Sequence, residues 1–132
     1  CLYQLLRREK RKSILMDNTQ VGHNFEDLAE DYLVINGYKI IKRNFHFGKL
    51  GEIDIVAEID NILVFCEVKG RNNSKYGTAI ESVTYGKQMK LRKAAEGYLN
   101  INKIVDKDCR MDLVAIDIIA GKPQITHLEN AF

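Results

Sequence analysis

Two short runs of alternating apolar residues, 51–59 and 62–69, flank the dipeptide Asp60-Asn61. Asp and Asn tolerate the positive φ angles of a two-residue hairpin turn, so the runs predict two antiparallel strands that meet at this point. The alternation gives the first strand one apolar face, which consists of Ile53, Ile55, Ala57 and Ile59. This face must be covered, which requires a sheet packed against another layer.

The same register brings charged residues together on the other face of the hairpin. It places Asp54 opposite Glu67, and Glu52 opposite Lys69. Opposed side chains on neighbouring strands have Cβ atoms about 5 Å apart, close enough for two carboxylates to bind one divalent cation. Because opposed like charges repel, the pair needs a counter-charge. The alternative is a solvated sheet face on which Lys69 is only a surface ion-pair partner.

Helical periodicity and turn residues place the remaining elements. A first helix is predicted around residues 25–33, with Asn24 as its cap and Gly37 at its end. Strands are predicted at 38–47, 110–119 and 124–128, the last of them at a sheet edge, and a second helix at 82–100. The predicted apolar stripe of this helix contains Tyr85, Met89, Ala95, Tyr98 and Leu99. This order predicts an α/β fold with a mixed central β-sheet flanked by helices.

The chain has the size and composition of one domain. Its 132 residues are 45% hydrophobic and contain a single proline, Pro123, with no linker-like tract. We expect residues 16–132 to form a single domain and residues 1–15, with five basic residues and one acidic residue, to form a basic, poorly ordered and dispensable extension.

Several classes of function lack support. The three cysteines have no zinc-like spacing and their odd number disfavours a disulfide framework, which indicates a reducing compartment and a cytoplasmic location. Cys66 is expected in the core and the three histidines, His23, His46 and His127, on the surface. No run of residues is long and apolar enough for a membrane span, and no phosphate-binding loop or serine-nucleophile motif is present.

Basic residues gather between positions 69 and 93, whereas the net charge of the whole chain is only +2. Cations beside a carboxylate pair suit a ligand with a phosphate backbone. The predicted phosphate contacts are Arg71, Lys75, Lys87 and Lys90. For Lys90, Arg92 and Lys93 a solvated helix face is the alternative.

The order Asp54, then Glu67-Val68-Lys69, resembles the PD-(D/E)xK nuclease superfamily with its restriction-endonuclease-like fold. A closer resemblance, to the YraN-like family of bacterial proteins, spans roughly residues 22–128. It is carried by Phe25-Glu26-Asp27-Leu28-Ala29, Gly51-Glu52-Ile53-Asp54-Ile55-Val56-Ala57, Glu67-Val68-Lys69-x-Arg71, Lys87 and Cys109-Arg110-Met111-Asp112-Leu113-Val114-Ala115-Ile116. That family is similar to archaeal Holliday-junction resolvases.

The resemblance implies metal-dependent hydrolysis of phosphodiester bonds in structured DNA. Asp54, Glu67 and the Val68 carbonyl would hold Mg²⁺ or Mn²⁺, Glu26 would join them from the first helix, and Lys69 would act on the attacking water or the transition state. Junction resolution needs two symmetric cuts, which implies a homodimer on DNA rather than RNA. A non-catalytic nucleic-acid-binding module and an interaction subunit of a DNA-processing complex remain the alternatives.

Overall fold

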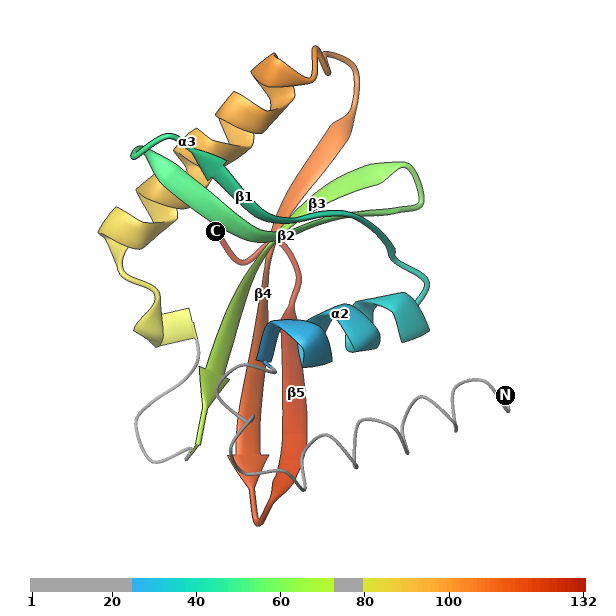
Figure 1. The fold of residues 1–132 in the computed structure, drawn as a ribbon, viewed down its shortest axis with the longest axis vertical. Coiled ribbons are helices and arrows are strands. Elements are labelled where there is room, and N and C mark those ends of the chain that lie inside the picture. Colours follow the sequence, from blue (N-terminus) through green and yellow to red (C-terminus); the bar gives the residue numbers. More distant parts are fainter. Residues whose placement is uncertain (1–24, 73–79) are drawn as a thin grey trace.

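The computed structural model describes residues 25–72 and 80–132, which form a five-stranded mixed sheet with one long helix on each face (Figure 1). The strands lie in the order β1-β2-β3-β4-β5. The elements are α2 (Phe25–Ile35), β1 (Lys39–Phe47), β2 (Gly51–Ile59), β3 (Ile62–Arg71), a 3-10 turn η1 (Ile80–Ser82), α3 (Tyr85–Ile101), β4 (Asp108–Ile119) and β5 (Lys122–Leu128). The predicted basic extension, the Asn24 cap, His23 and Lys75 lie outside the described residues.

The predicted β2–β3 hairpin and its register are confirmed. The antiparallel ladder runs from the pair Ile59 and Ile62 to the pair Ile55 and Cys66. Asp60 and Asn61 have φ angles of 48° and 65°, the left-handed conformations that a tight two-residue hairpin requires.

The ladder does not continue to Asp54, so the predicted strict alternation of β2 is wrong at one point. Ile55 packs in the core beneath α2, whereas Ile53 packs in the core beneath α3. Neighbouring β1 has the left-handed Asn44, φ 54°, between its pairs with Ile53 and Ile55. Both strands are therefore irregular at the same level, and the predicted direct pairs of Asp54 with Glu67 and of Glu52 with Lys69 are absent from the ladder.

Two hydrophobic layers hold the helices against the sheet. The layer between α2 and the sheet contains the buried side chains of Leu28, Leu33, Ile55, Val64 and Val114. The layer between α3 and the sheet contains those of Ile53, Val56, Leu63, Phe65 and Leu91. Figure 1 shows the two helices on opposite sides of the sheet. Cys66 is buried in the core, as predicted, and this burial raises the pKa of its thiol.

Helix α3 begins later than predicted and buries a different stripe. Thr84 is its N-cap, and the Thr84 side chain accepts a hydrogen bond from the Lys87 backbone N–H. The buried residues of the helix are Leu91, Ala94, Ala95, Gly97 and Tyr98. Tyr85 is 75% exposed and Met89 is 38% exposed, so their predicted place in the stripe is wrong. Only the second half of the prediction, which contains Ala95 and Tyr98, is confirmed.

The chain passes from β3 through α3 to β4, which pairs with β3 in parallel, and then turns back into the antiparallel edge strand β5. A parallel neighbour requires such a crossover, and here the crossover contains the helix that covers one face. The predicted α/β class is confirmed, and the mixed sheet between helices is consistent with a restriction-endonuclease-like fold. No helix within residues 25–72 and 80–132 is long and apolar enough to cross a membrane.

The turn that leads into β2 packs directly against α3. A Cβ atom at Gly51 would overlap the backbone carbonyl oxygen of Lys90, and this helical backbone cannot move independently. We expect Gly51→Ala to lower the free energy of unfolding by about 1–3 kcal/mol, the usual effect of overpacking. Gly86→Ala is the matched control, because a Cβ there meets nothing within 4 Å. Equal urea-denaturation midpoints for the two variants would contradict the close contact.

Candidate active site

Two carboxylates meet where β2 leaves its ladder with β3. Asp54 Oδ2 accepts a hydrogen bond of 2.8 Å from the backbone N–H of Val68. The Asp54 carboxylate thus accepts a hydrogen bond from the backbone of β3 just beyond the last pair of the β2–β3 ladder. Asp54 also lies within hydrogen-bonding contact of the Glu67 side chain. The predicted closeness of Asp54 and Glu67 is therefore confirmed, although a kinked strand rather than a regular ladder brings them together.

Burial and the charge of Glu67 favour a proton on Asp54. Removal from water and the neighbouring Glu67 charge raise the pKa of Asp54 to about 7, against the opposing hydrogen bond from Val68. Glu67 itself is 3% exposed. Near neutral pH Asp54 is therefore partly protonated beside Glu67, and a divalent cation could replace that proton.

Lys87 of α3 reaches across to this pair. Its Nζ lies 2.7 Å from Oε1 of Glu67, and this contact raises the pKa of Lys87. Lys69 lies two residues after Glu67 on β3, and so on the same side of the strand. The Lys69 side chain has no hydrogen bond or ion pair with any residue that the structure describes, so its ammonium group is available to a ligand.

An open cleft of about 480 Å³ lies between the β1–β2 turn and the first turns of α3. Its floor includes Glu67, and its walls carry the cations of Lys49, Lys87 and Lys90 together with His46 and Glu52. Lys90 is one of the predicted phosphate contacts, and here it lines the cleft. Glu52 lies 3.4 Å from His46, both side chains being 60% exposed, rather than opposite Lys69.

The third predicted carboxylate, Glu26, is held elsewhere. Oε2 of Glu26 lies 3.2 Å from Arg43, which also binds Asp27 at 2.6 Å. Glu26 acts on Asp54 only through its charge. Within the described ranges, no three His, Cys, Asp or Glu side chains are gathered in a group that could hold a metal ion. The structure thus brings together two of the three predicted acidic ligands.

A backbone carbonyl can complete the donor set for a metal ion. In an extended strand the N–H and C=O of one residue point to the same edge, and the N–H of Val68 points to Asp54. Two carboxylates and a carbonyl are the oxygen donors that Mg²⁺ and Mn²⁺ prefer. The residues therefore fit the predicted ion through Asp54, Glu67 and Val68.

The other predicted phosphate contacts differ in their surroundings. Arg71 binds Asp117 of β4 at 2.9 Å and the pair is largely buried, with side-chain exposures of 17% and 12%. Arg71 thus stabilises the parallel β3–β4 pair in the structure, whereas Lys87 and Lys90 face the cleft.

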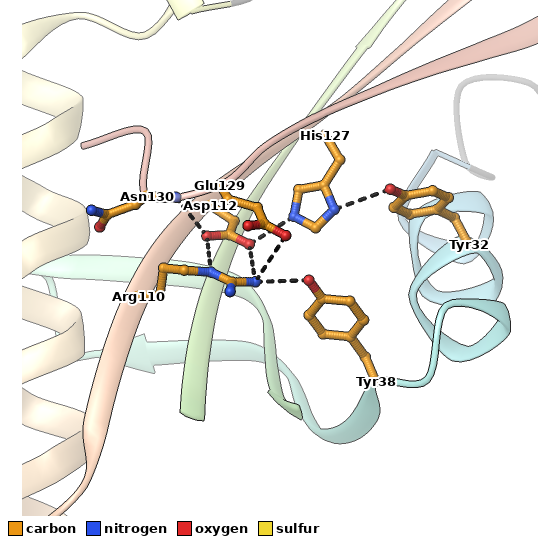
Figure 2. Close-up of polar contacts among 7 residues, drawn as sticks. All are labelled: Tyr32, Tyr38, Arg110, Asp112, His127, Glu129 and Asn130. Carbon is orange, nitrogen blue, oxygen red and sulfur yellow. Dashed lines mark hydrogen bonds and ion pairs between the residues drawn. The ribbon is translucent and has the colours of Figure 1, made fainter. Parts of the chain in front are cut away.

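A second polar cluster lies beside α2, and sequence reasoning missed it (Figure 2). Asp112 of β4 has no exposed surface and accepts two hydrogen bonds of 2.9 Å from Arg110, one from the Asn130 backbone N–H, and one of 2.7 Å with His127 Nε2. His127 Nδ1 lies 3.1 Å from the Tyr32 hydroxyl, and Arg110 donates to the Tyr38 hydroxyl. The predicted surface position of His127 is wrong, because its side chain is 7% exposed.

These contacts connect three elements of the fold. Tyr32 comes from α2, Arg110 and Asp112 from β4, and His127 from β5. Burial alone would raise the pKa of Asp112, but the hydrogen bonds from His127, Arg110 and Asn130 outweigh burial and hold this pKa below its usual value. The charge of Asp112 is therefore fully compensated, which is the condition for a stable buried ion. The alternating charges at positions 110 and 112 were the available signal in the sequence.

Residues 25–120 match the family described as "Uncharacterised protein family UPF0102". The chain belongs to this family. A UPF0102 protein of Sulfurihydrogenibium sp. (strain YO3AOP1) is 48% identical over 117 residues, which cover 89% of this chain and 97% of that relative. UPF0102 proteins of Alkaliphilus oremlandii and Shewanella sediminis are 41% and 44% identical, over 87% and 89% of this chain and 99% and 100% of their own lengths. The Asp54 strand, the Glu67-Val68-Lys69 segment and the whole of β4 lie within the part that matches the UPF0102 family.

Proposed function

We propose that this UPF0102 protein is a Mg²⁺- or Mn²⁺-dependent nuclease that hydrolyses phosphodiester bonds in structured DNA. The observation that carries the proposal is the Asp54–Glu67 pair, held in contact at the end of a strand ladder beside a basic cleft. A pair in which burial and the Glu67 charge disfavour the ionisation of Asp54 contributes little to the fold, whereas it suits an ion that the reaction needs.

Each group then has a part in the chemistry. Asp54, Glu67 and the carbonyl of Val68 would hold the cation, which when bound activates water and neutralises charge on the phosphate. The Val68 N–H fixes the orientation of the Asp54 carboxylate. Lys69 is placed to orient the attacking water or to stabilise the charge of the transition state. Lys49 and Lys90 hold the phosphate backbone along the cleft.

The test is a cleavage assay on linear, flapped and four-way DNA, with matched RNA, in Mg²⁺, Mn²⁺ and EDTA. We expect cutting of at least one branched DNA with either metal and none in EDTA. Lys69→Ala should slow the wild-type reaction about 10²-fold or more without loss of binding. Salt-dependent binding of these DNAs with no cleavage under any condition would favour the non-catalytic binding module instead.

Cleavage of a four-way junction would further require a second copy, because the junction has two symmetric strands to cut. We therefore propose a homodimer on this substrate. Light scattering of the protein–junction complex should give two chains per junction.

Mn²⁺ affinity should depend on pH through Asp54. Burial and the Glu67 charge raise the pKa of Asp54 to about 7, so below that pH the cation must displace a proton. We expect Mn²⁺ binding to tighten about tenfold per pH unit between pH 5 and 7 and to level off above 7. Measurement of free Mn²⁺ by electron paramagnetic resonance follows this directly. A pH dependence that persisted unchanged in Asp54→Asn would place the responsible group elsewhere.

A further inference from the structure

Lys87 occupies the part of the site that a cation would need. Glu67 is almost fully buried, and among the described residues its one ion-pair partner is Lys87, with 2.7 Å between Nζ and Oε1. A buried carboxylate requires such a counter-charge. The lysine side chain itself is 44% exposed, so its ammonium group is not locked in place.

The position of Lys87 on the helix allows it to leave Glu67 without disturbing the fold. Its backbone is fixed in the first turn of α3 by the hydrogen bond from its N–H to Thr84 Oγ1. The Lys87 side chain has a flexible four-carbon stem and lines the same open cleft as Lys49 and Lys90. Rotation of this side chain alone would move its ammonium group from the floor of the cleft to its walls.

We infer that Lys87 takes the place of the divalent cation and neutralises Glu67 when that cation is absent. When the cation binds, it displaces Lys87, and the Lys87 ammonium group then binds a phosphate in the cleft. This inference rests on the proposed function for the identity of the cation and of the phosphate ligand. The exchange couples cation binding to nucleic-acid binding, because one event releases the group that serves the other. Without the divalent cation, the protein would then bind nucleic acid with one positively charged side chain fewer.

The first experiment measures the accessibility of the Lys87 amine by acylation and mass spectrometry, with and without Mn²⁺ and without nucleic acid. We expect saturating Mn²⁺ to raise acylation of Lys87 about fivefold, the upper end of the range for breaking an ion pair whose lysine is partly exposed. Lys90 is the internal control, because it lines the same cleft and its side chain has no hydrogen bond or ion pair with any described residue. Equal labelling of Lys87 with and without bound Mn²⁺ would overturn the exchange.

The second experiment removes the competing ammonium group. Lys87→Met should bind Mn²⁺ about fivefold more tightly than wild type, whereas Lys90→Met should change the affinity much less. In anisotropy measurements on a labelled DNA flap, Lys87→Met should weaken binding more in Ca²⁺ than in EDTA, and Lys90→Met should weaken it equally in both. Equal behaviour of the two variants in these measurements would contradict the proposal.

These results separate the exchange from the nuclease. If Mn²⁺ binds and DNA is cut while the labelling of Lys87 stays constant, the exchange is wrong and the proposed activity stands. If labelling rises with Mn²⁺ but no DNA or RNA is cut, the exchange stands and the proposed activity is wrong.

Discussion

Replacing Asp112 by Asn is expected to lower the free energy of unfolding by about 3–5 kcal/mol, the usual cost of removing one partner from a buried ion pair. The asparagine would leave the largely buried Arg110 guanidinium, 17% exposed, without its bidentate carboxylate partner. An amide oxygen also cannot accept all of the hydrogen bonds that Arg110, His127 and Asn130 donate to the two carboxylate oxygens. Urea denaturation at pH 7 measures the change.

The matched control is Glu129→Gln, which removes a carboxylate from the same cluster. Glu129 lies 3.7 Å from Arg110 but its side chain is 61% exposed. An exposed pair is worth about 0–1 kcal/mol, so this variant should be nearly as stable as wild type. If Asp112→Asn unfolds at the same urea concentration as the control, the cluster does not stabilise the fold.

Asp54→Asn, unlike Asp112→Asn, should not lower the free energy of unfolding, but it should strongly reduce metal-dependent cleavage. An asparagine can still accept from the Val68 N–H and donate to Glu67, as the protonated aspartic acid does. It cannot ionise, so the repulsion with Glu67 is removed. We expect Asp54→Asn to be at least as stable as wild type at pH 8 without divalent cations. We expect its metal-dependent cleavage to fall by at least about 10²-fold.

The sign of the pH dependence follows from the raised pKa. Between the usual value of 3.8 and the folded value of about 7, the folded state keeps a proton on Asp54 that the unfolded state has lost. This contribution is present at low pH and is lost as the pH rises through about 7. The stability of wild type relative to Asp54→Asn should therefore decline from pH 5 to pH 8 in EDTA. A parallel course of the two curves would show that Asp54 ionises normally.

Short-range rules were sufficient to predict the hairpin. Asp60 and Asn61 determine the turn, and a turn of two residues determines the register of every pair up to Ile55 and Cys66. The irregularity at Asp54 could not be predicted in this way, because it depends on the neighbouring strand β1 and on the carboxylate that bonds to Val68. Asn44 was the one local signal, since asparagine tolerates the left-handed conformation that it adopts.

The incorrect assignments have a common physical origin. Large apolar residues at helical spacing were expected in the core, but Tyr85 and Met89 lie on the side of α3 that faces away from it. His127 was expected on the surface because its partners, Tyr32 and Asp112, are 95 and 15 residues away in the sequence. Contacts of that kind depend on the order of strands in the sheet, which periodicity alone does not determine.

The parallel pairing of β3 and β4 determines when, during synthesis, the site becomes complete. The β2–β3 hairpin is local and can form as soon as residues 51–71 have left the ribosome. Its strand β3 remains an open sheet edge until β4, residues Asp108–Ile119, arrives to pair with it. The ribosome synthesises the residues of the proposed site before β4, the strand that pairs with β3 and stabilises it. These residues are Asp54, Glu67, Lys69 and Lys87. A chain that stops before β4 carries these groups on an unfinished sheet, and they are held in place only after β4 has paired with β3.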